Sequence, residues 1–461
     1  MTAPSPVPTP TSMPVPSATS TPTTAVPGTA PLAAEPSADE RKREKRPPKA
    51  SVHRPASAAA RFHMSRAAID RSVEEFATWS DLKCIRHFAT IRWGSYKVVS
   101  CAHCETSDEH YWSAKELRWR CTHCRKKFSV TSNTVFANRR LPWQKLLAAI
   151  HLWACGAAGQ PALELRRMLC LGGYNTAFTL ISKLREGLSR GFNTGLISGL
   201  VEMDGAHAAG RRASEKRGRP QTFRINSPEE AKDDALLTTT AKVKKRQAEK
   251  RAAIAAGGIV HPEHGTVFPA GRRMVFTLRR RSGAKGKGSL VTRVGVGLAE
   301  TPDVAQALVD LYVATPESIL STDLGNAFYK VGKEFQLHLQ VNHSETLVGP
   351  EGQHVNNSEG FTARQDRSEK GIYLNIEAKY LHDYVVETAF REDHRRLAPG
   401  AQADRALFWA LNVGLSHYWR GFTHGKHRDY EILKPANRPA KASGPAKGSS
   451  PVSAVNGRPP R

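Results

Sequence analysis

Residues 197–204 read ISGLVEMD, an apolar run that ends at an acid, Asp204. Branched and apolar side chains in such a run predict a β-strand. Residues 318–322 (SILST) predict a second strand, which leads directly to another acid, Asp323. Because carboxylates at the ends of adjacent strands can converge on one point, we expect these two acids to lie close together.

A third acid, Glu359, opens a segment at 358–367 for which we predict a helix. Three carboxylates held together repel one another unless cations neutralise them. Hard oxygen ligands of this kind suit Mg²⁺ or Mn²⁺, and two such ions ~4 Å apart would stabilise the attacking and leaving oxygens of a phosphoryl transfer. We expect Glu202 to point to the opposite face of its strand from Asp204, and leave it out of the site.

The segments around these acids predict a mixed α/β domain over 198–425. Strand patterns come first, and strands then alternate with helices, which is typical of that fold class. A Gly/Lys-rich turn joins the first two of the remaining strands, so we expect a hairpin. The predicted strands cover 272–280, 290–298 and 337–341, and the predicted helices cover 305–313 and 376–391.

A cysteine-rich module at 98–130 contains two CxxC pairs separated by 16 residues. Each pair presents two sulfurs from one tight turn, and two pairs complete the tetrahedron that a structural zinc ion requires. The predicted ligands of one structural Zn²⁺ are therefore Cys101, Cys104, Cys121 and Cys124. A site of this kind stabilises a module too small to fold alone.

Helical segments lie on both sides of this module. Short helices are expected over 64–97, and apolar residues at helical spacing predict further helices over 137–195. Within the second segment, two short helices flank Gly172-Gly173. This pattern is compatible with a helix-turn-helix that binds DNA and also with an ordinary helical hairpin, and the sequence leaves both open.

The chain has 461 residues, and 68 Lys+Arg against 42 Asp+Glu give a net charge of 68 − 42 = +26. Such an excess points to a polyanionic partner, with nucleic acid the leading candidate. No apolar run reaches 18 residues and no export signal is visible, so we expect a cytoplasmic protein without a membrane span. Seven cysteines in such a chain favour metal ligands over disulfides.

The two ends of the chain are expected to be disordered. Thirteen of the 29 prolines fall within the first 55 residues, so residues 1–60 bury too little to offset the entropy of ordering them. Residues 434–461 have a similar composition, rich in Pro, Ala, Gly and Lys. A stretch at 211–270, dense in Lys and Arg, is interpreted as a basic insertion in the α/β domain.

An ordered set of motifs over about 80–425 resembles the DDE transposases of bacterial insertion sequences, in the ISXO-like group with an N-terminal zinc ribbon. Besides the double CxxC, the matching motifs are LPW (141–143), VEMD (201–204), STD (321–323), VNHS (341–344), HVNNSEGF (354–361) and FREDHRR (390–396). The resemblance implies a ribonuclease H-like catalytic domain, preceded by the zinc ribbon and the helical segment.

The resemblance also implies roles for individual residues. Asp204, Asp323 and Glu359 would be the catalytic triad that binds two Mg²⁺ or Mn²⁺ ions. Asn356 would be an auxiliary polar residue or an alternative third ligand. Asp366 occupies the place where the family often has Lys or Arg, so we take Arg367 as the basic residue that contacts DNA.

By this resemblance the protein would be a transposase that binds terminal inverted repeats, cleaves the element ends and joins them to target DNA. It would act on double-stranded DNA as a homo-oligomer, in the bacterial cytoplasm at the nucleoid. Two alternatives stay open. One is a non-catalytic zinc-ribbon DNA-binding protein or domesticated relic, and the other is a metal-dependent nuclease that never joins ends.

Overall fold

The computed structural model describes residues 58–209, 272–283, 288–342, 348–349, 352–374, 376–421 and 428–433, together with short pieces between 241 and 268. The predicted C-terminal tail and most of the basic insertion at 211–270 lie outside these residues. So does the predicted N-terminal tail, except that residues 58–60 already belong to helix α1 (Ala58–His63). Within the described residues, no helix is both long enough and apolar enough to cross a membrane.

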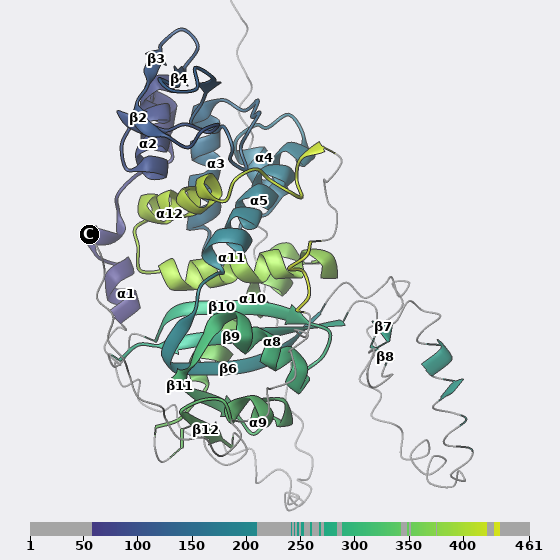
Figure 1. The fold of residues 1–461 in the computed structure, drawn as a ribbon. Helices are drawn as coiled ribbons and strands as arrows, with labels where there is room; N and C mark the ends of the chain where they lie inside the picture. Colours follow the sequence, from purple (N-terminus) through teal and green to yellow (C-terminus); the bar gives the residue numbers. More distant parts are fainter. Residues whose placement is uncertain are drawn as a thin grey trace, which may run out of the picture. The chain divides into compact units, whose positions relative to one another are not determined.

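A five-stranded mixed sheet forms the centre of the predicted α/β domain (Figure 1). Its strand order is β10-β9-β6-β11-β12; β6, β9 and β10 pair antiparallel, whereas β11 and β12 run parallel to β6. The predicted mixed α/β class and the predicted hairpin are thus confirmed. The strands are β6 (Ile197–Ala209), β9 (Arg272–Arg281), β10 (Ser289–Gly297), β11 (Val313–Asp323) and β12 (Leu337–Val341).

Strand β6 is longer than the sequence predicted. Its pairing with β9 continues past Asp204 to Ala209, so Asp204 lies inside the strand and not at its end. Strand β11, in contrast, ends at Asp323 as predicted. The residues after Asp204, Gly-Ala-His-Ala, lack the apolar alternation by which a strand is recognised, and backbone pairing with β9 extends the strand instead.

Helices cover both faces of the sheet (Figure 1). On one face, Val201 and Met203 join a core with helices α8 (Pro302–Tyr312) and α9 (Asn326–Gly332). The other face packs against α10 (Asn356–Arg367) and α11 (Leu381–His394). Successive side chains on a strand alternate between faces, so Glu202 points toward α10. The helical turn η5 (Ser368–Tyr373) follows α10, and the helical turn η6 (Ala378–Tyr380) precedes α11.

The helices that precede the sheet in sequence pack on the side of α11 that faces away from the sheet (Figure 1). A buried ion pair of 2.5 Å between Arg185 and Glu387 joins α5 to α11, and Trp153 stacks on Phe390. Helix α12 (Pro399–Asn412), which the sequence analysis missed, packs against α3 and α5. The other helical elements are α3 (Trp143–Cys155), α4 (Ala162–Met168), α5 (Tyr174–Gly187) and the π-helical turn η4 (Leu188–Phe192).

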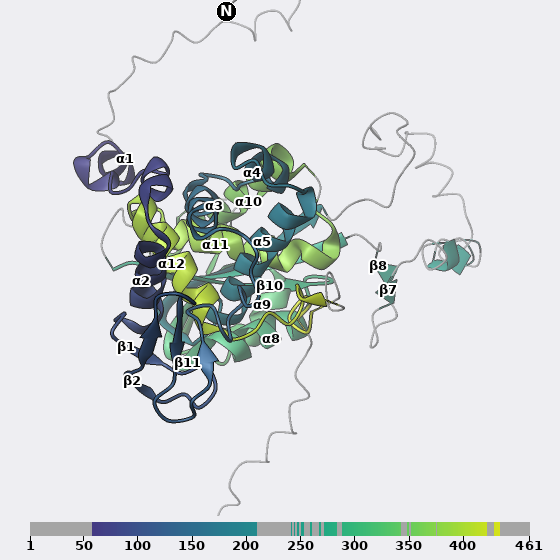
Figure 2. The ribbon, with the colours of Figure 1, turned by 90° about the horizontal axis from the view of Figure 1, so that it is seen from above.

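The cysteine-rich module lies next to helix α2 (Asp81–Trp93) in both views of the structure (Figures 1 and 2). Before α2, the expected short helices are 3-10 turns, η2 (Arg66–Ala68) and η3 (Glu74–Thr78). The strands of the module are β1 (Val98–Ser100), β2 (Ser107–Glu109), β3 (Tyr111–Ser113), β4 (Arg118–Arg120) and β5 (Lys127–Phe128). Two further short strands, β7 (Ile259–Val260) and β8 (Val267–Phe268), pair with each other.

Candidate active site and metal centre

The first two predicted acids lie on neighbouring parallel strands. Strands β11 and β6 pair with Ser321 opposite Glu202, and two residues further along each strand are Asp323 and Asp204. Each carboxylate accepts a hydrogen bond from a glycine amide close by in the chain, 2.8 Å from Gly205 to Asp204 and 3.0 Å from the amide two residues after Asp323. The sheet therefore sets these two acids side by side.

The third acid comes from α10, which packs across β6 and β9. Glu359 lies in the first turn of this helix and is exposed. Asn356 is the first residue of the helix, one turn before Glu359 and so on the same side, and it is exposed as well. Arg367 is the last residue of α10 and lies at the opposite end of the helix from both.

Negative charge accumulates around Asp204. Burial, the charge of Asp323 and smaller effects of Glu300 and Glu359 together raise the pKa of its carboxyl to about 7 from an ordinary 3.8. The charges of both other predicted acids thus act on Asp204. The carboxylate oxygens of the three predicted acids do not all lie within 4.8 Å of one another. Among the described residues, only the ligand atoms of the four cysteines form a group that close. An excess of carboxylates around a desolvated acid fits a divalent cation.

Glu300 is an acid near this site that the sequence analysis missed. It follows β10, and one of its oxygens would lie 3.4 Å from a Cβ placed on Gly205. Burial and the charge of Asp323 raise the pKa of Glu300. In the sequence, Glu300 is marked only by its place shortly after a predicted strand, and many acids share that feature. Its position near Asp204 becomes visible only once the pairing of β10, β9 and β6 is known.

Glu202, which we expected on the opposite face of β6 from Asp204, lies on the same face. The expectation was wrong because residues two apart on a strand share a face. The Glu202 carboxylate is fully buried and accepts hydrogen bonds from the backbone and side-chain nitrogens of Asn357, at 3.0 and 2.6 Å. It also accepts from the amide of Ser358 at 3.4 Å and pairs with Arg281 at 2.8 Å. We call this set of contacts the Glu202 clamp.

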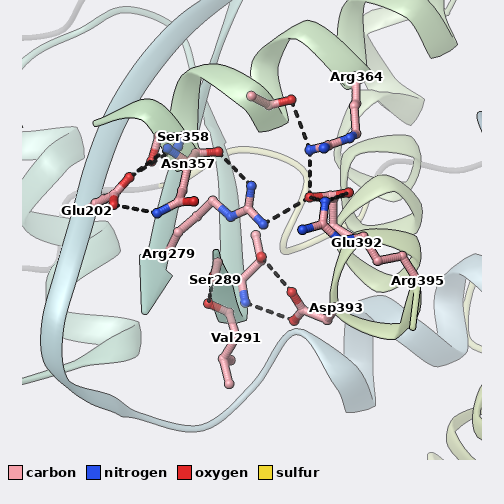
Figure 3. Close-up of polar contacts among 12 residues, drawn as sticks. Glu202, Arg279, Ser289, Val291, Asn357, Ser358, Arg364, Glu392, Asp393 and Arg395 are labelled. Carbon is pink, nitrogen blue, oxygen red and sulfur yellow. Dashed lines mark hydrogen bonds and ion pairs between the residues drawn. The ribbon is translucent and has the colours of Figure 1, made fainter. Parts of the chain in front are cut away.

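The Glu202 clamp fixes the start of α10, the helix that carries Glu359. A carboxylate at a helix N-terminus accepts the otherwise unpaired amides and is favoured by the helix dipole. From the other side, Arg279 donates to the carbonyl of Asn357 at 2.6 Å and pairs with Glu392 of α11 at 3.1 Å (Figure 3). The first turn of α10 is thereby held to β6, β9 and α11 at once.

The cysteine module brings its four predicted ligands together. The Sγ atoms of Cys101 and Cys124 are 3.7 Å apart, and those of Cys104 and Cys121 are 3.6 Å apart. Zn–S bonds of ~2.3 Å in a tetrahedron require sulfur–sulfur distances of roughly 3.8 Å, so the four sulfurs fit a zinc ion. Cys84, Cys155 and Cys170 take no part in this group.

The two CxxC turns have matching backbone geometry. The amides of His103 and His123 donate to the sulfurs of Cys101 and Cys121, each at 3.4 Å. Such amide–sulfur contacts stabilise a thiolate. Glu105 and Arg125, each the residue after the second cysteine of its pair, have positive φ angles of 59° and 61°. This repeated geometry, which the spacing alone did not reveal, is that of two preformed metal-binding turns.

Comparison with known families decides what the α/β domain is. Residues 196–393 match the family described as the ISXO2-like transposase domain. These residues are therefore similar to the transposase domain of insertion-sequence DDE transposases. The match runs from β6 to α11 and so contains Asp204, Asp323 and Glu359. Comparison with curated proteins gave no significant match, and comparison with solved structures gave none either.

The zinc interpretation predicts that Cys104→Ser will reduce bound zinc from about one ion per chain to almost none, because a serine hydroxyl cannot replace a thiolate ligand. Loss of the ion should unfold the module and abolish the near-ultraviolet circular dichroism of the stacked pair Trp119 and Phe128. Metal analysis and that spectrum measure both effects. The matched control is Cys170→Ser, an exposed cysteine outside the cluster. Full zinc content in the Cys104 variant would contradict the assignment.

The raised pKa of Asp204 predicts how stability depends on pH without divalent ions. A carboxyl whose folded pKa is raised contributes stability fully below its ordinary pKa, and that contribution is lost as pH rises through about 7. Asp204→Asn should therefore become more stable than wild type between pH 4 and 8, by up to about 4 kcal/mol. Thermal unfolding at several pH values measures this difference.

The same argument gives the expected effect of Mg²⁺. The ion should raise the unfolding temperature of the wild type more at pH 8, where Asp204 is ionised, than at pH 6, and should leave the Asp204→Asn variant almost unchanged. Asp310→Asn, at an exposed position on α8, serves as the control and should behave as wild type. An equal effect of Mg²⁺ on both variants would refute a cation at Asp204.

Proposed function

We propose that the protein is a DNA transposase that binds the terminal inverted repeats of its element, cleaves DNA at the element ends and joins the freed ends to target DNA. The observation that carries this proposal is the pair Asp204 and Asp323, set side by side on parallel strands within an ISXO2-like transposase domain. The mixed sheet with helices on both faces is compatible with a ribonuclease H-like catalytic domain.

In this proposal Asp204, Asp323 and Glu359 hold two divalent ions, Mg²⁺ or Mn²⁺, and Asn356 assists them or replaces Glu359 as the third ligand. The ions would supply positive charge to the oxygens of an in-line phosphoryl transfer. The chain contributes the placement of the acids: the sheet orients Asp204 and Asp323, and the Glu202 clamp orients the helix that carries Glu359.

The chemistry conserves the number of phosphodiester bonds during joining. In the first step a water oxygen attacks phosphorus at the element end, the bond from phosphorus to the 3′ oxygen breaks, and that oxygen takes up a proton. In the second step the freed 3′-hydroxyl loses its proton and attacks a phosphorus of the target strand. One target phosphodiester breaks as one new phosphodiester forms, and the displaced 3′ oxygen of the target strand takes up a proton, so no covalent intermediate with the protein is needed.

The remaining parts of the chain would bind DNA. The zinc ribbon formed by the four cysteines and helices α4 and α5, as a helix-turn-helix, would recognise the terminal repeats. A net charge of +26 adds sequence-independent contacts to phosphates. Two ends must be joined, so the protein would act as a homo-oligomer on double-stranded DNA, at the nucleoid of a bacterial cell.

A joining assay tests the function directly. The substrate is a labelled duplex that carries the short inverted repeat flanking the gene, with a plasmid target and Mg²⁺ or Mn²⁺. Asp204→Asn should lower cleavage and joining to below about one thousandth of wild type, since the ions lose a ligand, while end binding stays within about twofold. Asp310→Asn is again the control.

The outcomes of this assay separate the alternatives. Cleavage without joining would favour an ordinary nuclease, and sequence-specific binding without metal-dependent cleavage would favour a non-catalytic DNA-binding protein. Full strand transfer by the Asp204→Asn variant would refute the assignment of the site.

From the Glu202 clamp we predict that Glu202→Gln will impair catalysis, although residue 202 does not contact the reacting atoms. A glutamine amide would place a donor against the donors of Arg281 or Asn357, so α10 would be held less firmly. Cleavage should fall by about 100-fold, and the Mg²⁺ concentration for half-maximal rate should rise, because Glu359 is displaced. DNA-end binding, measured in Ca²⁺, should change little.

The matched control for this variant is Glu317→Gln, at an exposed position on β11. Unfolding of each variant is measured in parallel. A Glu202→Gln protein that is folded, with unchanged rate and unchanged Mg²⁺ dependence, would show that the clamp supports the fold alone.

A further inference from the structure

A second polar site lies at the C-terminal end of α10, away from the three acids. It is a cavity of about 630 Å³ between α10, α11 and the bend after α3. We call it the arginine pocket. Four arginines line it, together with small and apolar residues: Arg364, Arg367, Arg391 and Arg395, and Gly156, Ala157, Ala158, Leu397 and Pro399.

One buried carboxylate organises the basic side of the pocket. Glu392 is 7% exposed and pairs with Arg364 at 2.7 Å, with Arg279 at 3.1 Å and with Arg395 at 3.3 Å (Figure 3). Three guanidinium groups therefore share a single negative charge. The excess around Glu392 is therefore two positive charges, and of the three arginines Arg364 and Arg395 line the cavity.

The other arginines of the pocket do not reduce this excess. Arg391 pairs with Glu387 on the same helix, and Glu387 also pairs with Arg185, so these two cations share one negative charge. Arg367 is exposed and forms no ion pair with a described residue. Burial lowers the pKa of Arg364, and the charges of Arg395, Arg279 and Arg367 lower it further, which shows that these cations repel one another.

The dipole of α10 does not by itself explain why these arginines gather beside a cavity. Arg364 and Arg367 lie in the last turn of α10, where cations are favoured by the dipole. That explanation covers neither Arg395, which follows α11, nor a cavity of this size beside the arginines. A guanidinium group that borders an open space can bind a phosphate with two parallel hydrogen bonds.

We propose that the arginine pocket binds a phosphate group of a DNA strand. The identification of DNA as the molecule that carries this phosphate rests on the proposed function. Helix α10 carries Glu359 in its first turn and Arg364 and Arg367 five and eight residues later, so the pocket begins ~8–12 Å further along the helix axis. That span corresponds to roughly two to four base steps of ~3.4 Å. A strand processed at the acids would thus reach the pocket with a nearby phosphate.

Two measurements on the full chain test this proposal. The first is thermal unfolding with added inorganic phosphate, compared with chloride at equal ionic strength. Phosphate should raise the unfolding temperature of the wild type and have a smaller effect on Arg367→Gln and Arg395→Gln. Arg405→Gln removes a charge from an exposed position on α12 outside the pocket, and should respond as wild type.

The second measurement is the affinity for a 30-base-pair duplex between 50 and 300 mM NaCl. Each pocket variant should bind the duplex roughly fivefold more weakly at 100 mM salt, and the slope of log K against log salt should fall by about 0.9, the value for one lost phosphate contact. The Arg405→Gln control should keep the wild-type slope.

The results distinguish this proposal from the proposed function. A stabilising effect of phosphate together with an unchanged salt slope would identify a site for a free anion and overturn DNA as its source. No effect of the pocket variants in either measurement would overturn the site itself. Neither measurement involves cleavage, so loss of joining activity would reject the transposase function and leave the phosphate site standing.

Discussion

The buried carboxylate of Glu202 is the contact on which the geometry of the site depends. It lies on the same face of β6 as Asp204 and accepts the amides at the start of α10, whose first turn carries Glu359. Arg281 neutralises it and also donates to the carbonyl of His354 at 2.8 Å, just before the helix. Glu202 thus ties the strand that carries Asp204 to the helix that carries Glu359.

Charge is separated along α10. The N-terminal end of the helix faces the acids around Asp204, where burial and mutual repulsion raise a carboxyl pKa to about 7. Further along the helix, Arg364 and Arg395 share the single charge of Glu392 with Arg279, which leaves an excess of positive charge. Both excesses cost free energy in the isolated protein, and each is relieved by the opposite charge: cations at one end and phosphate at the other. A strand of DNA with bound divalent ions would satisfy both together.

Local patterns in the sequence predicted most elements of the domain but not their contacts. The strands that lead to Asp204 and Asp323 follow from short apolar runs, and the structure places them next to each other as expected; their parallel direction was not predicted. Helix α12 was missed although Ala403, Leu407 and Ala410 show helical spacing, so that signal was available. Contacts such as Arg279 with Glu392, which are 113 residues apart, leave no local pattern because they arise only when the sheet and α11 are assembled.

The cysteine module is not energetically separate from the rest of the fold. Its buried aromatic residues, Trp119 and Phe128, belong to the same continuous core as Trp153 of α3 and Phe390 of α11. Helix α11 also bears Glu392, which holds Arg279 and through it the start of α10. A core shared in this way is tightly packed and transmits displacements over several helices. A zinc ion that orders the module would therefore support the same helices that position Glu359 and the arginine pocket.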